Sequence, residues 1–215
     1  MRVRDVDRVP LMLLAAFAVV WILSARDSWY PSDWWLENVL VFIGIPALIL
    51  IHRKGSLSRL SYSLIFAFLC LHELGAHYTY AEVPYDKWLK ALTGTSLNEM
   101  LGWDRNHFDR LIHFLWGGLL TLPIRELVMR SGRSRGFMSY FVPFLVIVAS
   151  STIYELIEWQ AALLFGGDLG MAYLGTQGDI WDAHKDTTLA ISGGFVAIIG
   201  IWIYESSAAV LRGDR

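Results

Sequence analysis

Four stretches of the chain carry acids and histidines beside runs of apolar residues. They read LHELGAHYTY, NHFDRLIHF, STIYELIEWQ and GDIWDAHKDTT, and they begin at residues 71, 106, 151 and 178. An ionisable side chain within a membrane span costs several kcal/mol unless it pairs or faces a polar cavity. Because four stretches share this feature, we predict that their side chains line one pocket. The candidate catalytic residues are His72, Glu73, His77, Asp109, Arg110, His113, Glu155, Glu158, Asp182 and Asp186.

The spacing of these residues suits a helical framework. In four pairs the partners are three or four residues apart, so they share a face wherever the segment is helical. The pairs are Glu73–His77, Asp109–His113, Glu155–Glu158 and Asp182–Asp186. Helices that carry such faces at the same depth would bring imidazoles and carboxylates together.

Imidazole and carboxylate groups together are typical ligands of zinc, and carboxylates alone suit magnesium. The candidate cofactor is therefore a divalent metal, zinc or magnesium. Its predicted ligands are His77, His113, Glu155, Asp182 and Asp186. A metal-bound water supplies hydroxide near neutral pH. The pattern thus favours a metal-dependent membrane hydrolase that acts on an envelope lipid or a lipid-linked small molecule.

Two other classes of function fit the same residues. Acids and histidines within a membrane also relay protons or admit solutes in small transporters, including proton-coupled permeases. Alternatively, the residues form a buried salt-bridge network, in which Arg110 and Lys185 neutralise acids and fix the helix register of a non-catalytic envelope or assembly protein. The sequence leaves these alternatives open.

The elements that must position these residues are membrane helices. Of the 215 residues, 55% are hydrophobic and 18% are charged, and the mean hydropathy is +0.43. The apolar residues form six blocks of the length that crosses a bilayer, at about 9–25, 34–51, 60–78, 108–124, 138–164 and 187–206. We predict an all-α polytopic membrane protein, a single bundle of about six transmembrane helices in one integral membrane domain, 1–215. The third-to-fourth connection, which contains VPYDKWLKALTGTSLNEMLGW, is expected to form short interfacial helices.

Basic residues concentrate in alternate loops, and this bias predicts the orientation. The other loops, which alternate with these basic ones along the chain, are longer and are rich in acidic and aromatic residues. The basic set consists of Arg2, Arg4, Arg8, Arg53, Lys54, Arg59, Arg125, Arg130, Arg133, Arg135, Arg212 and Arg215. Both termini are therefore predicted to be cytoplasmic, and the four acid- and histidine-bearing stretches face the outer side. A net charge of −2 gives no reason to expect nucleic acid as a partner. Membrane lipids are the expected partners, and the oligomeric state stays open.

Four motifs resemble the YjdF family of bacterial inner-membrane proteins, a family of unknown function. The motifs are HELGAHYTY, GWDRNHFDRLIHF, YELIEW and GDIWDAHKDT, and they stand in the expected order. The resemblance extends from about Trp34 to the end of the sixth predicted helix. It implies a multi-pass protein of the bacterial inner membrane, and it brings no established activity with it.

A fainter resemblance is to VanZ-like proteins, which are cell-envelope membrane proteins associated with resistance to glycopeptide antibiotics. Their Asp-x-x-x-His-Phe, Glu-x-x-Gln and Asp-x-x-x-Asn patterns are similar to Asp109/His113/Phe114, Glu155/Glu158 and Asp182/Asp186. Two acids of this chain, Glu158 and Asp186, stand where that family has amides. These departures make the site more acidic and favour a bound cation.

Overall fold

The fold was analysed in a computed structural model that describes residues 7–55, 57–130, 132 and 134–212. The described residues form helices and no strand. The long helices are α1 (Val9–Ala25), α3 (Val39–Lys54), α4 (Arg59–Tyr78), α7 (Phe108–Arg130), α8 (Met138–Phe165) and α10 (Asp182–Arg212). The short ones are α2 (Pro31–Glu37), η1 (Tyr80–Glu82), α5 (Tyr85–Thr93), α6 (Leu97–Leu101) and α9 (Gly167–Leu174).

The predicted all-helical membrane bundle is confirmed. Five helical segments are long and apolar enough to cross a membrane, and α1 is a shorter apolar helix of the same kind. Each of the six apolar blocks is therefore helical. Apolar side chains such as Ile43 of α3 and Leu163 of α8 are more than half exposed on the bundle, as is typical of surfaces that face lipid.

The second predicted span, 34–51, is divided into α2 and α3 at Asn38. α2 begins at Pro31, whose fixed backbone angle and missing N–H suit the first position of a helix. The Asn38 side chain donates to the Trp34 carbonyl at 3.0 Å and accepts from the Trp21 indole at 2.6 Å. The backbone hydrogen bonds from Asn38 to Trp34 and from Phe42 to Asn38 continue across this point, so α2 and α3 together form one candidate span, Pro31–Lys54.

Other boundaries also differ from the predicted ones. α7 continues to Arg130, beyond the predicted end at 124, and α10 begins at Asp182, before the predicted start at 187. A span predicted from hydropathy ends where polar residues begin, whereas the backbone hydrogen bonds of a helix can continue through polar residues. Asp182 also lies in the first turn of α10, where a negative charge is favourable. The third-to-fourth connection contains the expected short helices, α5 and α6, and their place in the interface stays a prediction.

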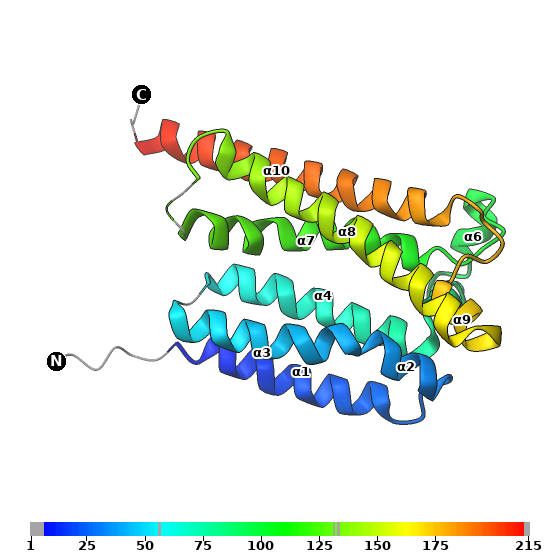
Figure 1. The fold of residues 1–215 in the computed structure, drawn as a ribbon. Coiled ribbons are helices and arrows are strands. Elements are labelled where there is room, and N and C mark those ends of the chain that lie inside the picture. The colour runs from blue at the N-terminus through cyan, green and yellow to red at the C-terminus, as the bar shows by residue number, and fades with distance from the viewer. Residues whose placement is uncertain (1–6, 56, 131, 133, 213–215) are drawn as a thin grey trace.

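The helices form two groups, which Figure 1 shows side by side. One group contains α1, α3 and α4, and the other contains α7, α8 and α10, with α4 packed on α7. α7 and α10 approach most closely. An added Cβ at Gly193 would lie 1.9 Å from the Phe114 carbonyl oxygen, and one at Gly117 would lie 2.0 Å from the Ala190 carbonyl oxygen. Glycine at both positions is what permits this approach.

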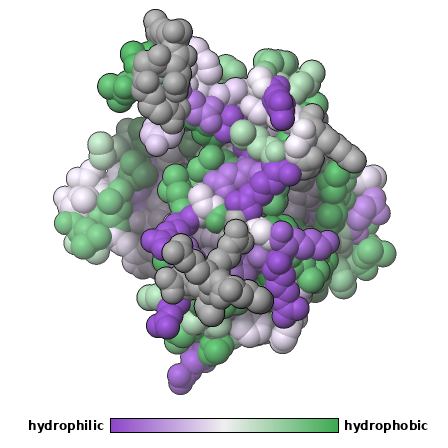
Figure 2. Space-filling view, turned by 90° about the vertical axis from the view of Figure 1, so that its left-hand side faces the viewer, coloured by the Kyte–Doolittle hydropathy of each residue, from purple (hydrophilic) through white to green (hydrophobic). Residues whose placement is uncertain are grey.

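The connections are sorted between the two ends of the bundle. α1 begins and α10 ends at one end, while α2, α6 and α9 lie at the other (Figure 1). Figure 2 views the first end and shows hydrophilic side chains across its middle, with hydrophobic ones around the rim. This arrangement fits the predicted alternation of loops. Arg2, Arg4, Arg133 and Arg215, which contributed to the predicted orientation, lie outside the described residues.

The orientation leads to a first testable prediction. Reporter fusions after Thr95 and after Gly175 should report the periplasm, and a fusion after Arg135 should report the cytoplasm, because arginine-rich loops are retained on the cytoplasmic side. Paired alkaline phosphatase and green fluorescent protein fusions measure both states. A cytoplasmic signal at Thr95 would contradict the predicted orientation.

Candidate functional site

A group of four side chains lies where α7, α8 and α10 meet. Ligand-type atoms of Asp109, His113 and Asp186 all lie within 4.8 Å of one another. His113 Nε2 is 3.5 Å from Asp109 Oδ1 and 3.6 Å from Glu155 Oε1. We call Asp109, His113, Glu155 and Asp186 the carboxylate–histidine cluster. The predicted spacing positions it, because Asp109 and His113 are one helical turn apart on α7.

The cluster is shielded from solvent and is short of hydrogen bonds. The exposed fraction is 7% for His113 and 2% for Asp186. The buried atoms Asp186 Oδ1 and Glu155 Oε1 have no hydrogen-bond partner among the described residues. Buried polar atoms normally find partners, so atoms without one call for an explanation such as an ion or a water.

A separate ion-pair network joins α7 and the residue Arg105 before it to the loop before α10 and the first turn of α10. Arg105 Nη1 is 2.6 Å from Asp182 Oδ1, and Arg110 Nη2 is 2.6 Å from Asp179 Oδ2. Lys185 donates a hydrogen bond to the same Asp179 oxygen at 2.5 Å, and this contact lowers the pKa of Asp179 to about 2. We call these five residues the mouth network.

Two predicted site residues belong to the mouth network and not to the carboxylate–histidine cluster. Asp182 and Arg110, both candidate site residues, pair within this network, and Asp182 is absent from the group of Asp109, His113 and Asp186. Arg110 also lies 3.4 Å from Asp182 Oδ1. Arg110 and Lys185 both pair with acids of the mouth network. In the carboxylate–histidine cluster, the ion pairs among the described residues involve only His113.

Glu73 and His77 share a face of α4, as their spacing predicts, but that face packs on α1 and α2. Ser24 of α1 donates a hydrogen bond to Glu73 Oε2, and the Ser24 carbonyl oxygen is 2.9 Å from His77 Nδ1. The indole of Trp34 donates to Ser24 Oγ at 2.9 Å. These contacts place Glu73 and His77 in a second polar group, which among the described residues forms no hydrogen bond or ion pair with the carboxylate–histidine cluster.

His72 and Glu158 complete the predicted set. His72 points away from His77, as expected from the spacing, and its Nδ1 shares a hydrogen bond with the Tyr80 hydroxyl. Glu158 is buried on α8, one turn beyond Glu155.

Sequence reasoning missed Glu37 and Arg105. Glu37 is buried at the end of α2, and Tyr154 donates a hydrogen bond to its Oε2 at 3.2 Å. A single acid within the apolar stretch WWLENVLVF was the available signal for it. Arg105 carried no such signal, because its partner Asp182 is distant in sequence and only the fold brings them together.

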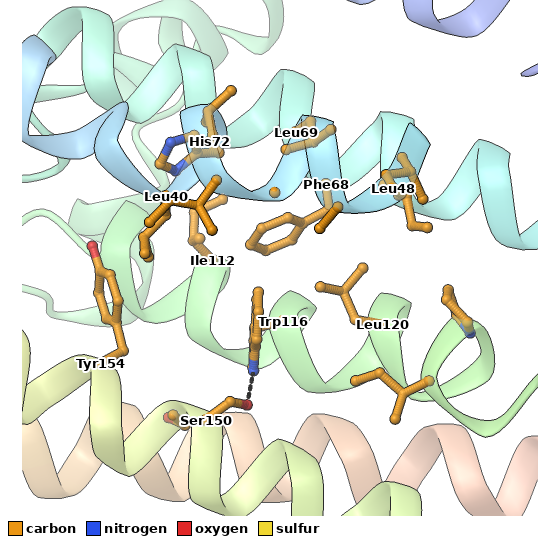
Figure 3. A pocket seen from close by; sticks show the side chains of 18 of the residues that line it. Leu40, Leu48, Phe68, Leu69, His72, Ile112, Trp116, Leu120, Ser150 and Tyr154 are labelled. Carbon is orange, nitrogen blue, oxygen red and sulfur yellow. Dashed lines mark hydrogen bonds between the residues drawn. The ribbon is translucent and has the colours of Figure 1, made fainter. Parts of the chain in front are cut away.

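An apolar groove with a volume of about 550 Å³ leads to the cluster between α3, α4, α7 and α8. Its walls are mostly aliphatic and aromatic, with Leu48, Phe68 and Trp116 among them (Figure 3). Trp116 donates to Ser150 Oγ at 3.1 Å, drawn as a dashed line in Figure 3. The polar side chains at one end of the groove are His72, Tyr80, Asp109, His113 and Tyr154.

The bundle of long apolar helices defines a class, the polytopic membrane proteins. A family model described as "Predicted membrane protein (DUF2238)" matches residues 9–207. The chain is 38% identical over 178 residues to "Inner membrane protein YjdF" of Escherichia coli (strain K12), an alignment that covers 82% of this chain and 79% of that relative. No solved structure matches.

The chain belongs to the DUF2238 membrane protein family, and the predicted resemblance to the YjdF family is confirmed. It is a multi-pass membrane protein whose relative is an inner-membrane protein of E. coli. The fainter resemblance to VanZ-like proteins stays a prediction.

Proposed function

We propose that the protein binds an envelope lipid or a lipid-linked molecule, with the hydrocarbon chain in the apolar groove and the head group at the carboxylate–histidine cluster. The observation that carries this proposal is the continuity of the two. An apolar groove of about 550 Å³ ends at Asp109 and His113. Its volume lies within the range of typical ligand pockets, and an apolar pocket with a few converging polar groups is the usual form of a ligand site.

The walls of the groove support entry from the membrane. Ile43 of α3 and Ile153 of α8 both line the groove, and their exposed fractions are 63% and 55%. Side chains of this kind at the edge of a membrane bundle face lipid tails. A chain-like apolar ligand can therefore pass between α3 and α8 without leaving the hydrocarbon layer. A water-soluble substrate would have no use for such a groove.

The reaction we propose is hydrolysis at the head group. The candidate nucleophile is a water at the carboxylate–histidine cluster: its oxygen would bond to the carbonyl carbon or phosphorus of a head-group ester, the ester oxygen would leave as an alcohol, and Glu155 beside His113 would accept the proton of the water. The predicted orientation puts this site in the outer half of the membrane, where lipid-linked envelope molecules present their head groups.

A bulky residue in the groove tests the binding step. Gly44 lines the groove, and an added Cβ there meets no atom within 4 Å, so Gly44→Phe should fill the groove without a backbone clash. Gly200→Phe is the matched control: Gly200 is also an exposed helical glycine with open space around it, but it lies on α10 outside the groove. Mass spectrometry of lipid that copurifies with each variant should show a specific lipid with wild type and Gly200→Phe and its loss with Gly44→Phe.

The same pair of variants separates this proposal from transport. Lipid profiles of a deletion strain should change, and Gly200→Phe should restore them whereas Gly44→Phe should not. Unchanged lipids together with altered solute uptake in the deletion strain would favour a small transporter instead. Unchanged lipids and unchanged uptake would favour an assembly role.

A further inference from the structure

We infer that Asp109, His113 and Asp186 ligate a divalent metal ion, with Glu155 beside it. The inference goes beyond the proposed function, because an ion can bind whether or not a lipid enters the groove. It rests on the geometry of the cluster, on a buried carboxylate oxygen without a partner, and on the balance of charge around the site.

The distances within the cluster suit ligands that surround one ion. His113 Nε2 lies 3.5 Å from Asp109 Oδ1 and 3.6 Å from Glu155 Oε1. Both distances exceed the usual 2.7–3.2 Å of a hydrogen bond between nitrogen and oxygen. Ligands about 2.0–2.1 Å from a tetrahedral zinc ion are about 3.4 Å apart. Each of the two distances is therefore close to that between neighbouring ligands, and the atoms that all lie within 4.8 Å of one another belong to Asp109, His113 and Asp186.

Asp186 supplies the independent observation. Its exposed fraction is 2%, and its Oδ1 has no hydrogen-bond partner among the described residues. One of its carboxylate oxygens lies within 4.8 Å of the ligand atoms of both Asp109 and His113. Glu155 Oε1, 3.6 Å from His113 Nε2, is likewise buried without a hydrogen bond. A cation between these oxygens would give both of them the partner that buried polar atoms require.

The charge around the site also favours a cation. The nearest arginines, Arg105 and Arg110, pair with Asp182 and Asp179 in the mouth network, as does Lys185. In the described part of the chain, the ion pairs of Asp109 and Glu155 are formed with His113, and Asp186 forms none. Three carboxylates thus share one imidazole in a buried site. A divalent ion removes the repulsion between them.

These ligands differ from the set that the sequence suggested. His113 and Asp186 stay in the set, Asp109 joins it, and Glu155 lies beside the ion. His77 binds the Ser24 carbonyl, and Asp182 binds Arg105, so both have other partners. The imidazole ligand favours zinc over magnesium, since imidazole suits zinc and magnesium prefers oxygen ligands alone.

The experiment uses the full-length protein purified in detergent, stripped with a chelator and reloaded with Zn²⁺ alone. Elemental analysis and zinc titration should give one ion per chain for wild type. Loss of a mere hydrogen-bond partner of a metal ligand costs about 10–100-fold in affinity. Removal of a direct ligand in Asp186→Asn, or separately in His113→Gln, should therefore weaken Zn²⁺ binding at least tenfold.

The control is Glu73→Gln, which removes another fully buried carboxylate, on α4 outside the cluster. Its zinc affinity should match wild type. Size-exclusion profiles identify any variant that fails to fold, and the two ligand variants provide independent readings. No Zn²⁺ on the reloaded wild type overturns the inference, as does wild-type affinity in both ligand variants or equal weakening in Glu73→Gln. A failure of lipid binding in Gly44→Phe tests leaves these zinc measurements unaffected.

Discussion

Gly193→Ala is expected to lower the free energy of unfolding by about 3 kcal/mol, the upper end of the usual range for overpacked cores. The added methyl group would lie 1.9 Å from the Phe114 carbonyl oxygen and 2.9 Å from the Gly118 nitrogen. Both atoms belong to the backbone of α7, so no side-chain rotation relieves the contact. α7 and α10 must separate, and in doing so they move His113 and Asp186 apart.

Gly200→Ala is the matched control for this substitution. Gly200 lies on the same helix, and an added Cβ there meets no atom within 4 Å. Both changes raise helix propensity by the same amount, so only the helix contact differs. Thermal unfolding in detergent measures the pair: Gly200→Ala should match or exceed wild type, and Gly193→Ala should unfold at a clearly lower temperature. Equal stabilities would show that the α7–α10 contact is looser than described.

The close approach of α7 and α10 is a condition for the site. The carboxylate–histidine cluster requires the first turns of these helices to lie within side-chain reach, and Gly117 and Gly193 permit this near their middles. Larger residues there would give an equally apolar bundle without the cluster. The glycines and the acids therefore serve one arrangement, although they are separated along both helices.

Hydropathy was sufficient to predict the helices, because a bilayer span needs a run of apolar residues and a chain of this composition has few other places for them. The same property did not reveal the boundary between α2 and α3 at Asn38 or the short helix α9. The Asn38 side chain forms hydrogen bonds with Trp21 and Trp34 at this boundary. α9 begins at Gly167, which has a positive φ like Gly166 before it; a pair of glycines marks a turn in a sequence without showing where the chain goes next.

The sequence identified most residues of the candidate site, but it did not show which of them lie together. Helical spacing correctly places Asp109 and His113 on one face, since spacing is a local property. Whether a polar face of α4 turns toward α7 or toward α1 is decided by packing, and Glu73 and His77 turn toward Ser24 of α1. The sequence argument grouped Glu73 and His77 with the cluster residues only because all of them have a similar predicted depth in the membrane. Their actual neighbours required the tertiary structure.

The distinction between the cluster and the mouth network has a chemical meaning. In the mouth network Asp182 faces Arg105 and Asp179 faces Arg110 and Lys185, so each of the two acids has at least one basic partner among the side chains. In the cluster the acids outnumber the nearby basic groups. The first arrangement is expected of a structural seal, and the second of a site that takes its balancing charge from a ligand.

Arg105→Gln should therefore destabilise the protein by about 3 kcal/mol, the lower end of the range for one partner removed from a buried ion pair. Arg105 donates to Asp182 at 2.6 Å and to the Thr176 carbonyl at 3.0 Å, so the substitution leaves a buried carboxylate without its main partner and frees the loop before α10. Arg110, 3.4 Å from Asp182 Oδ1, keeps the loss from being larger.

A double-mutant cycle with Asp182→Asn isolates the pair. If the pair is a structural seal, removal of the orphaned charge should make the double variant more stable than Arg105→Gln alone, with a coupling energy of about 1–3 kcal/mol. Chemical unfolding in detergent gives the four stabilities, and zinc titration of the same four proteins should give similar affinities. If Asp182→Asn alone abolished zinc binding while leaving stability unchanged, Asp182 would belong to the metal site and the seal would be refuted. The cycle thus separates two roles of acidic residues in one bundle: Asp182 pairs with the arginine side chain of Arg105, and Asp186 is proposed to bind a metal ion.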